Sequence, residues 1–105
     1  MIYIMNTSIL TGFGSYDYEP ISLESVIERM TDNQTLSAIG HESTADVITT
    51  LTGITVKMNR ISVDMQIGDS AIVFKLDARP PEGAILDQKE LERIGFSWGL
   101  ITRTK

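Results

Sequence analysis

Residues 61–79 read ISVDMQIGDSAIVFKLDAR, and this stretch decides the fold that the sequence predicts. Apolar and polar residues alternate over 61–67, which is typical of a half-buried strand. A Gly-Asp turn follows at 68–69, and a second alternating run then has an inward face made of Ile72, Phe74, Leu76 and Ala78. We expect the two runs to pair as a β-hairpin. The outer face of this hairpin carries Lys75 and Arg79 and would be left for a ligand or a second subunit.

Three helices are predicted outside this hairpin, each from apolar residues at helical spacing. Ser22 marks the start of the first helix, which is about ten residues long. The second helix follows Ser43 and ends at Gly53, because glycine is favoured just after the last helical residue. Asp87 caps the third helix, which ends at Gly95.

Two further strands complete the expected sheet. Residues 2–6 form a short apolar run that predicts a strand buried on both faces, and residues 96–103 predict a final strand. Residues 11–20 are rich in Gly, Ser, Asp and Pro, so they predict a loop with a short extended piece at 16–19. The expected order is β-α-α-β-β-α-β, in an α+β fold whose mixed sheet of roughly five strands has helices on one face.

Composition limits the class of protein. The chain has 105 residues, which predicts a single domain over 1–105. It has no cysteine, no signal-peptide pattern and no apolar run of membrane-spanning length, so we expect a soluble, cytoplasmic protein without a membrane partner. A formal net charge of −5 argues against a protein that grips long DNA or RNA. It does not argue against a small anionic ligand held by a few placed donors.

Residues 39–44, IGHEST, place the only histidine just before a predicted helix. The first turn of a helix presents unpaired N–H groups and a partial positive charge, which favour an anion. Gly40 would let a phosphate approach the backbone, and His41 can exchange a proton near neutral pH. The alternative is purely structural: Ser43 followed by Asp46 is an ordinary N-cap pattern, and Gly40 could serve only a turn.

A second candidate segment, RPPEG at 79–83, follows the hairpin. Rigid loops at strand ends are common places for working side chains. Arg79 can bind a phosphate through two hydrogen bonds, and Glu82 can position a hydroxyl or act as a base. The alternative is a solvated Arg/Glu pair on a surface loop, which contributes little.

Smaller polar clusters lie at 6–8 and 59–60. Asn6-Thr7-Ser8 follows the first strand and can donate to phosphate oxygens or ribose hydroxyls, although such residues also form ordinary caps and turns. Asn59-Arg60 precedes the hairpin and allows the same two interpretations, an anion contact or a turn residue with a surface charge.

Other chemistries lack their motifs. The chain has no nucleophile elbow, no P-loop and no G-x-G-x-x-G, and no convergent metal-ligand spacing among Asp64, Asp69 and Asp77. What remains is acid–base chemistry by His41, Glu82 and Arg79 without a cofactor. These groups suit RNA cleavage in which a 2′-hydroxyl attacks the adjacent phosphate and a histidine protonates the leaving 5′-oxygen. Arginine and helix-start amides would stabilise the charge that develops.

Several motifs of the chain resemble those of one known family. They are SAIGHESTA at 37–45, LTG at 51–53, MNR at 58–60, VFKL at 73–76 and RPPEGAIL at 79–86. In this order and spacing they resemble the viral type III anti-CRISPR ring nucleases and their bacterial and mobile-element relatives. The opening NTSIL at 6–10 is similar to the bacterial and phage branch, whereas archaeal viral members tend to have Asn-Ala-Phe there.

The resemblance implies a homodimer that binds cyclic tetra-adenylate, the second messenger of type III CRISPR defence, in the cytoplasm of a prokaryotic host. It implies cleavage to linear di-adenylates ending in a 2′,3′-cyclic phosphate, with no metal or other cofactor. The family's general acid falls on His41, its catalytic glutamate on Glu82 and its helper arginine on Arg79. We expect substrate contacts from Asn6, Thr7, Ser8, Gly40, Ser43, Thr44, Arg60, Lys75 and Gly83.

Two other functions stay open on the sequence. One is a binding protein of the same fold that sequesters the ring, or a protein partner, without turnover. The other is a dimeric interaction module of a virus or mobile element that binds no nucleotide. The presence of His41, Glu82 and Arg79 together favours the enzyme, because a sequestering protein need not keep an acid.

Overall fold

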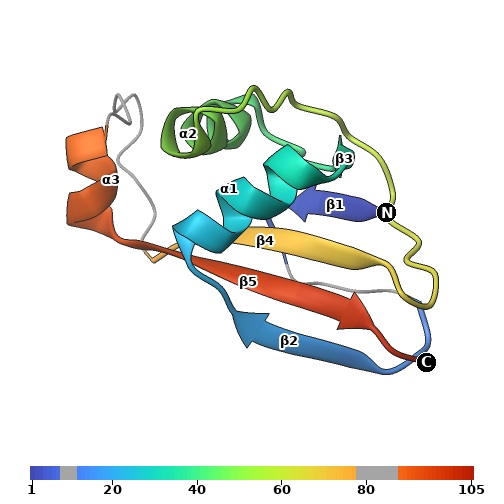
Figure 1. Cartoon of the computed structure of the whole chain (residues 1–105). Coiled ribbons are helices and arrows are strands. Elements are labelled where there is room, and N and C mark those ends of the chain that lie inside the picture. The colour runs from blue at the N-terminus through green and yellow to red at the C-terminus, as the bar shows by residue number, and fades with distance from the viewer. Residues whose placement is uncertain (8–11, 78–87) are drawn as a thin grey trace.

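A computed structural model of the chain describes residues 1–7, 12–77 and 88–105. Five strands form one sheet in the order β2-β5-β4-β1-β3 (Figure 1). Their bounds are β1 Ile2–Met5, β2 Tyr16–Pro20, β3 Thr35–Ser37, β4 Ser70–Leu76 and β5 Phe96–Arg103. The three helices of the described residues are α1 Leu23–Asp32, α2 Glu42–Thr52 and α3 Gln88–Ile94. Strand β1 pairs in parallel with β3 and β4, and β5 pairs antiparallel with β4 and β2, so the predicted α+β fold with a mixed sheet is confirmed.

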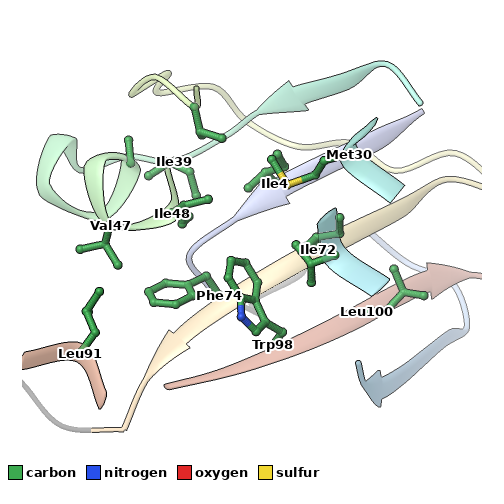
Figure 2. Packing of buried hydrophobic residues seen from close by; sticks show 13 residues of the cluster. Ile4, Met30, Ile39, Val47, Ile48, Ile72, Phe74, Leu91, Trp98 and Leu100 are labelled. Atoms are coloured by element: carbon green, nitrogen blue, oxygen red, sulfur yellow. The ribbon is translucent and has the colours of Figure 1, made fainter. Parts of the chain in front are cut away.

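All three helices pack on the same face of the sheet, as predicted (Figure 1). Side chains from α1, α2 and α3 enter one buried cluster together with side chains from β1, β4 and β5. Figure 2 shows Val47 and Ile48 of α2 and Leu91 of α3 around Phe74 of β4. Burial of apolar surface in this cluster is the main force that holds the helices to the sheet.

Strand β4 lies in the middle of the sheet and is apolar on both faces. Ile72 and Phe74 face the helices and are 0% and 2% exposed. Ala71 and Val73 point to the opposite face and are equally buried, at 0% and 2%. The predicted open face is therefore wrong at Val73, because a second apolar cluster covers the sheet there.

The predicted hairpin is also wrong, because residues 61–67 form no strand. Both edges of β4 are already occupied, by β1 on one side and β5 on the other, so no place is left for a hairpin partner. The alternating pattern of 61–67 has another cause. Met65 is 3% exposed and Val63 packs against the same cluster, whereas Ile61 and Ile67 are 40% and 68% exposed. The segment covers the second face of the sheet with alternate side chains and without ladder hydrogen bonds.

Two strands were not predicted as such. Residues 16–20, expected as a loop with a short extended piece, form edge strand β2 against β5. Residues 35–37 form the short edge strand β3 beside β1. The observed order is thus β-β-α-β-α-β-α-β rather than β-α-α-β-β-α-β. Short edge strands carry weak local signals because their partners, distant in sequence, supply the pairing.

Several predicted helix ends are confirmed. The Ser22 hydroxyl accepts a hydrogen bond from the Ser25 backbone N–H at 3.1 Å and caps α1. The Gly95 N–H donates to the Leu91 carbonyl at 2.9 Å and ends α3. The predicted cap Asp87 lies outside the described residues.

Gly53 ends α2 in a left-handed conformation, with φ +72°, and its N–H donates to the Thr49 carbonyl at 2.9 Å. No atom lies within 4 Å of the position that a Cβ would take, so a side chain would meet only backbone strain. We therefore expect Gly53→Ala to lower the free energy of unfolding by about 1 kcal/mol, measured by urea denaturation. Gly12→Ala is the matched control, because Gly12 lacks a positive φ and a Cβ there would meet no atom closer than 3.4 Å. Equal losses in both variants would contradict this explanation.

Asp69 joins the N-terminus to the turn before β4. One carboxylate oxygen accepts the Gln66 N–H at 2.9 Å, and the other accepts the Met1 ammonium group at 3.2 Å. The Gln66 hydrogen bond is the main cause that lowers the pKa of Asp69, and the ammonium group lowers it further. The folded state therefore favours the ionised carboxylate.

We expect Asp69→Asn to destabilise the protein at neutral pH and to matter less in acid. A lowered pKa contributes stability that is fully present above the unfolded value of about 3.9 and is lost as the pH falls through the folded value. Urea midpoints of parent and variant, measured from about pH 7 downwards, should therefore differ at neutral pH. They should converge only when the pH falls below the folded-state pKa of Asp69. Asp17→Asn, which changes an exposed carboxylate on β2, controls for net charge. A difference between parent and Asp69→Asn that grows in acid would refute the assignment.

Candidate functional site

Polar residues gather where two neighbouring parallel strands end. Asn6 and Thr7 follow β1, and Gly40 and His41 follow β3. Because β1 and β3 run in parallel, their carboxyl ends lie at the same edge of the sheet. In sheets of this kind, ligands bind in the crevice outside the carboxyl ends of the strands.

A cavity of about 540 Å³ lies at this edge. It is lined by Asn6, Thr7, Ala38, Gly40, His41, Arg60, Ile61 and Ser62. Three segments that are far apart in the sequence, at 6–7, 38–41 and 60–62, thus meet in one place. Five of the predicted site residues are brought together there: Asn6, Thr7, Gly40, His41 and Arg60.

His41 is itself the N-cap of α2, with φ −132° and ψ 130°. Its carbonyl accepts the Ala45 N–H at 3.1 Å, but its side chain makes no capping hydrogen bond. The helix begins at Glu42, so the interpretation of Ser43 as the N-cap is wrong. The backbone of His41 is therefore fixed at a helix start, and its exposed side chain lines the cavity.

Gly40 has no conformational need to be glycine. The φ angle of Gly40 is not positive, and a Cβ at this position would come no closer than 4.0 Å to Arg60 Cγ. The interpretation of Gly40 as a residue required by a turn is therefore not supported by its backbone. A side chain at Gly40 would instead take up space beside Arg60 at the cavity. The Gly40 carbonyl accepts a hydrogen bond from Arg60 Nε at 3.0 Å.

Three other predicted contacts lie near the site without lining the cavity. Ser43 and Thr44 are in the first turn of α2, where backbone N–H groups lack helical partners. Glu42 in the same turn puts a negative charge at the positive end of the helix dipole. Lys75 is exposed on β4, beyond the last residue pair of the β1–β4 ladder, Met5 and Val73.

Four predicted site residues, Ser8, Arg79, Glu82 and Gly83, lie outside the described residues. The last described residue before 78–87 is Asp77, directly after β4. Strand β4 is parallel to β1, so Asp77 lies at the same edge of the sheet as Asn6. Residues 78–87, which contain Arg79 and Glu82, therefore follow in the sequence directly after a residue at this edge.

Three lining residues were not predicted: Ala38, Ile61 and Ser62. Ala38 lies within the SAIGHESTA motif and Ile61 directly follows the MNR motif, yet an alanine and an isoleucine carry no chemical signal of their own. Ser62 was placed on the wrong element, since residues 61–67 were expected to form a strand. Proximity to Gly40 and Arg60 was the only available sequence signal.

Within 1–7, 12–77 and 88–105, no three His, Cys, Asp or Glu side chains are grouped so that they could hold a metal ion. Over the same ranges, no helix is both long and apolar enough to cross a membrane.

The mixed sheet, the helices on one face and the polar cavity at its parallel edge define a small α+β protein with a candidate ligand site. The family model described as STIV B116-like matches residues 2–98, and the chain belongs to this family.

Relatives of the chain occur in archaeal viruses and in a bacterium. The chain is 34% identical to ORF117 of Acidianus two-tailed virus, a match that covers 100% of the chain and 95% of that protein. It is 35% identical to YddF of Bacillus subtilis strain 168, over 97% of the chain and 96% of that protein. Protein 26 of a Sulfolobus islandicus filamentous virus is 30% identical, over 92% and 86% of the two chains.

A solved structure has the same fold. The structure of B116 of Sulfolobus turreted icosahedral virus superposes with a TM-score of 0.83, at 24% identity, and covers 97% of this chain and 98% of that one. The predicted fold class is therefore confirmed. The expected relation to viral proteins is confirmed by the STIV B116-like family match and the viral relatives.

Proposed function

We propose that the protein is a metal-independent ring nuclease that binds cyclic tetra-adenylate and cleaves it to linear di-adenylates. One observation carries the proposal: His41, Arg60, Gly40, Asn6 and Thr7, from three separate segments, line one cavity at the parallel edge of the sheet. An acid–base group, a fixed cation and small polar donors are what a phosphodiester substrate requires. The choice of cyclic tetra-adenylate as the substrate rests on the motifs that resemble the ring nucleases. The same motifs assign roles to Arg79 and Glu82, which lie outside the described residues.

In the proposed reaction, the ring supplies its own nucleophile. The 2′-oxygen of one ribose forms a bond to the adjacent phosphorus, and the bond from that phosphorus to the 5′-oxygen breaks. Glu82 accepts the proton of the 2′-hydroxyl, and protonated His41 donates a proton to the leaving 5′-oxygen. The products are a 2′,3′-cyclic phosphate and a 5′-hydroxyl, and no water is consumed. Two such cuts convert the ring into two di-adenylates.

Positive groups would stabilise the phosphate as its charge develops. The Arg60 guanidinium, Arg79 and the free N–H groups of the first turn of α2 are the proposed donors. A homodimer would suit the ring, because a two-fold assembly can present the same site to each half of a symmetric ligand. Cleavage would antagonise type III CRISPR signalling in the cytoplasm of the prokaryotic host.

The test is to incubate the purified protein with cyclic tetra-adenylate in EDTA and to separate the products by chromatography. We expect di-adenylate with a 2′,3′-cyclic phosphate. Tight binding of the ring without any product would refute the nuclease and select a sequestering protein instead. Neither binding nor product would favour an interaction module that takes no nucleotide. Sedimentation with and without the ring would decide whether the active species is a dimer.

A further inference from the structure

We propose that Asn59 is a positioning residue of the candidate site, and that it holds Arg60 and His41 at one cavity. The inference rests on the proposed function for its ligand but not for its geometry. On the sequence, Asn59 could be an anion contact or a turn residue. Its hydrogen bonds in the structure assign it a different task.

Asn59 donates two hydrogen bonds to carbonyl groups at the end of β3 and just after it. Its side-chain Nδ2 donates to the Ser37 carbonyl at 2.8 Å, and its backbone N–H donates to the Ile39 carbonyl at 2.8 Å. Ser37 is the last residue of the edge strand β3, so the segment around Asn59 lies along an otherwise open edge. The Ile39 side chain is 0% exposed and anchors this stretch in the core.

Further hydrogen bonds lie on both sides of Asn59. The Ser37 hydroxyl donates to the Lys57 carbonyl at 2.6 Å, and Arg60 Nε donates to the Gly40 carbonyl at 3.0 Å. Together these bonds join residues 37–40 to residues 57–60 along their whole length. This pairing connects the segment that ends in His41 to the segment that ends in Arg60.

Within 57–60, polar bonds rather than burial set the position of the chain. Lys57, Met58 and Arg60 are exposed, and Asn59 is the one half-buried residue of the four. No side chain of these residues belongs to the buried core. The Asn59 side chain is therefore one of the polar constraints on where Arg60 begins, because its loss would leave the Ser37 carbonyl without this donor and would favour separation of the two segments.

The consequence for the site follows from the position of Arg60. Its Nε donates to the Gly40 carbonyl, next to His41, which restricts where the guanidinium group can lie. The remaining guanidinium donors can then meet a phosphate beside the imidazole. If Asn59 lost its amide donor, Arg60 would be displaced and phosphate binding would weaken, although Asn59 itself would touch no substrate.

The test compares Asn59→Asp with a matched control. A carboxylate has the size of the amide but cannot donate to the Ser37 carbonyl. Asn33→Asp makes the same change at the end of α1, where Asn33 Nδ2 donates to the Arg29 carbonyl at 3.0 Å. We expect the Kd for cyclic tetra-adenylate to rise about tenfold in Asn59→Asp and to stay unchanged in Asn33→Asp. Equal affinity of parent and Asn59→Asp overturns the inference.

A double-mutant cycle separates positioning from general loss of stability. If Asn59 acts through Arg60, Asn59→Asp adds no further loss of affinity in an Arg60→Ala background. Additive losses would mean that Asn59 acts independently of Arg60 and would overturn the inference. Thermal unfolding of each variant shows that the proteins compared are folded at the assay temperature.

A second readout needs no ligand. His41 is the only histidine, so its imidazole Cε1–H gives one proton NMR signal that no other residue can duplicate. We expect this signal to shift or broaden in Asn59→Asp and to match the parent in Asn33→Asp. If the parent neither binds nor cleaves the ring, the proposed function fails, and this signal alone decides the inference. An unchanged signal in Asn59→Asp then overturns it.

Discussion

His41→Ala is expected to abolish detectable cleavage of cyclic tetra-adenylate while leaving the fold intact. Loss of a general acid typically reduces the rate by about 10²- to 10⁴-fold. The imidazole is exposed and makes no capping hydrogen bond, so its removal should change the free energy of unfolding little. The measurements are multiple-turnover cleavage in EDTA, which gives kcat, and the Kd of the ring for the same preparations.

The changes in kcat and in Kd, taken together, are more informative than the loss of cleavage alone. Because His41 would act on the leaving oxygen, we expect kcat to fall while the Kd changes by only a few-fold. His41→Asn is the matched variant: asparagine is a preferred N-cap residue, which keeps the helix start, but it cannot donate a proton as an acid. Parent-like cleavage in both variants would exclude His41 as the acid. A large rise in Kd with unchanged kcat would make it a binding residue only.

Phe74→Ala is expected to produce the largest loss of stability. The Phe74 side chain is 2% exposed in the middle strand of the sheet. Its ring lies 4.8 Å from the ring of Trp98 and 5.9 Å from that of Phe96, centroid to centroid. Its ring lies close to side chains of α2 and α3 (Figure 2), so we expect its removal to leave a cavity on the helix side of the sheet. We expect a loss of about 3–5 kcal/mol in the free energy of unfolding, measured by urea denaturation.

Such a loss approaches the total stability of many small domains, which is about 5–15 kcal/mol. The variant should therefore unfold at low urea or be partly unfolded without it. Phe13→Ala is the control, because Phe13 is 97% exposed and its removal should leave the urea midpoint near that of the parent. A parent-like midpoint for Phe74→Ala would mean that this aromatic cluster does not hold the sheet and helices together.

The elements predicted best are those whose signals are local. Helix α1 begins after Ser22, α2 ends at Gly53 and β5 runs over Phe96–Arg103, each as the spacing and the cap residues indicate. A capping hydroxyl or a left-handed glycine acts within a few residues, so the sequence contains all of the relevant interactions. The same holds for His41 at the start of a helix.

The errors lie where pairing between distant segments decides the structure. Residues 61–67 have the period of a strand, but β1 and β5 already occupy both edges of β4. A period of two reports alternate burial of side chains and does not say whether the backbone has a partner. Edge strand β2 was expected only as a short extended piece within a loop, because its partner β5 lies far along the chain. Tyr16, for example, pairs with Arg103.

The sequence by itself determined the α+β class, the three helices and the residue types of the candidate site. Only the tertiary structure decided that Asn6, His41 and Arg60 line one cavity, and that Asn59 joins the two segments that carry the last two. The physical reason is one of range. Periodicity and capping are set within a few residues, whereas a cavity forms only when strand order brings separate chain ends to one edge of the sheet.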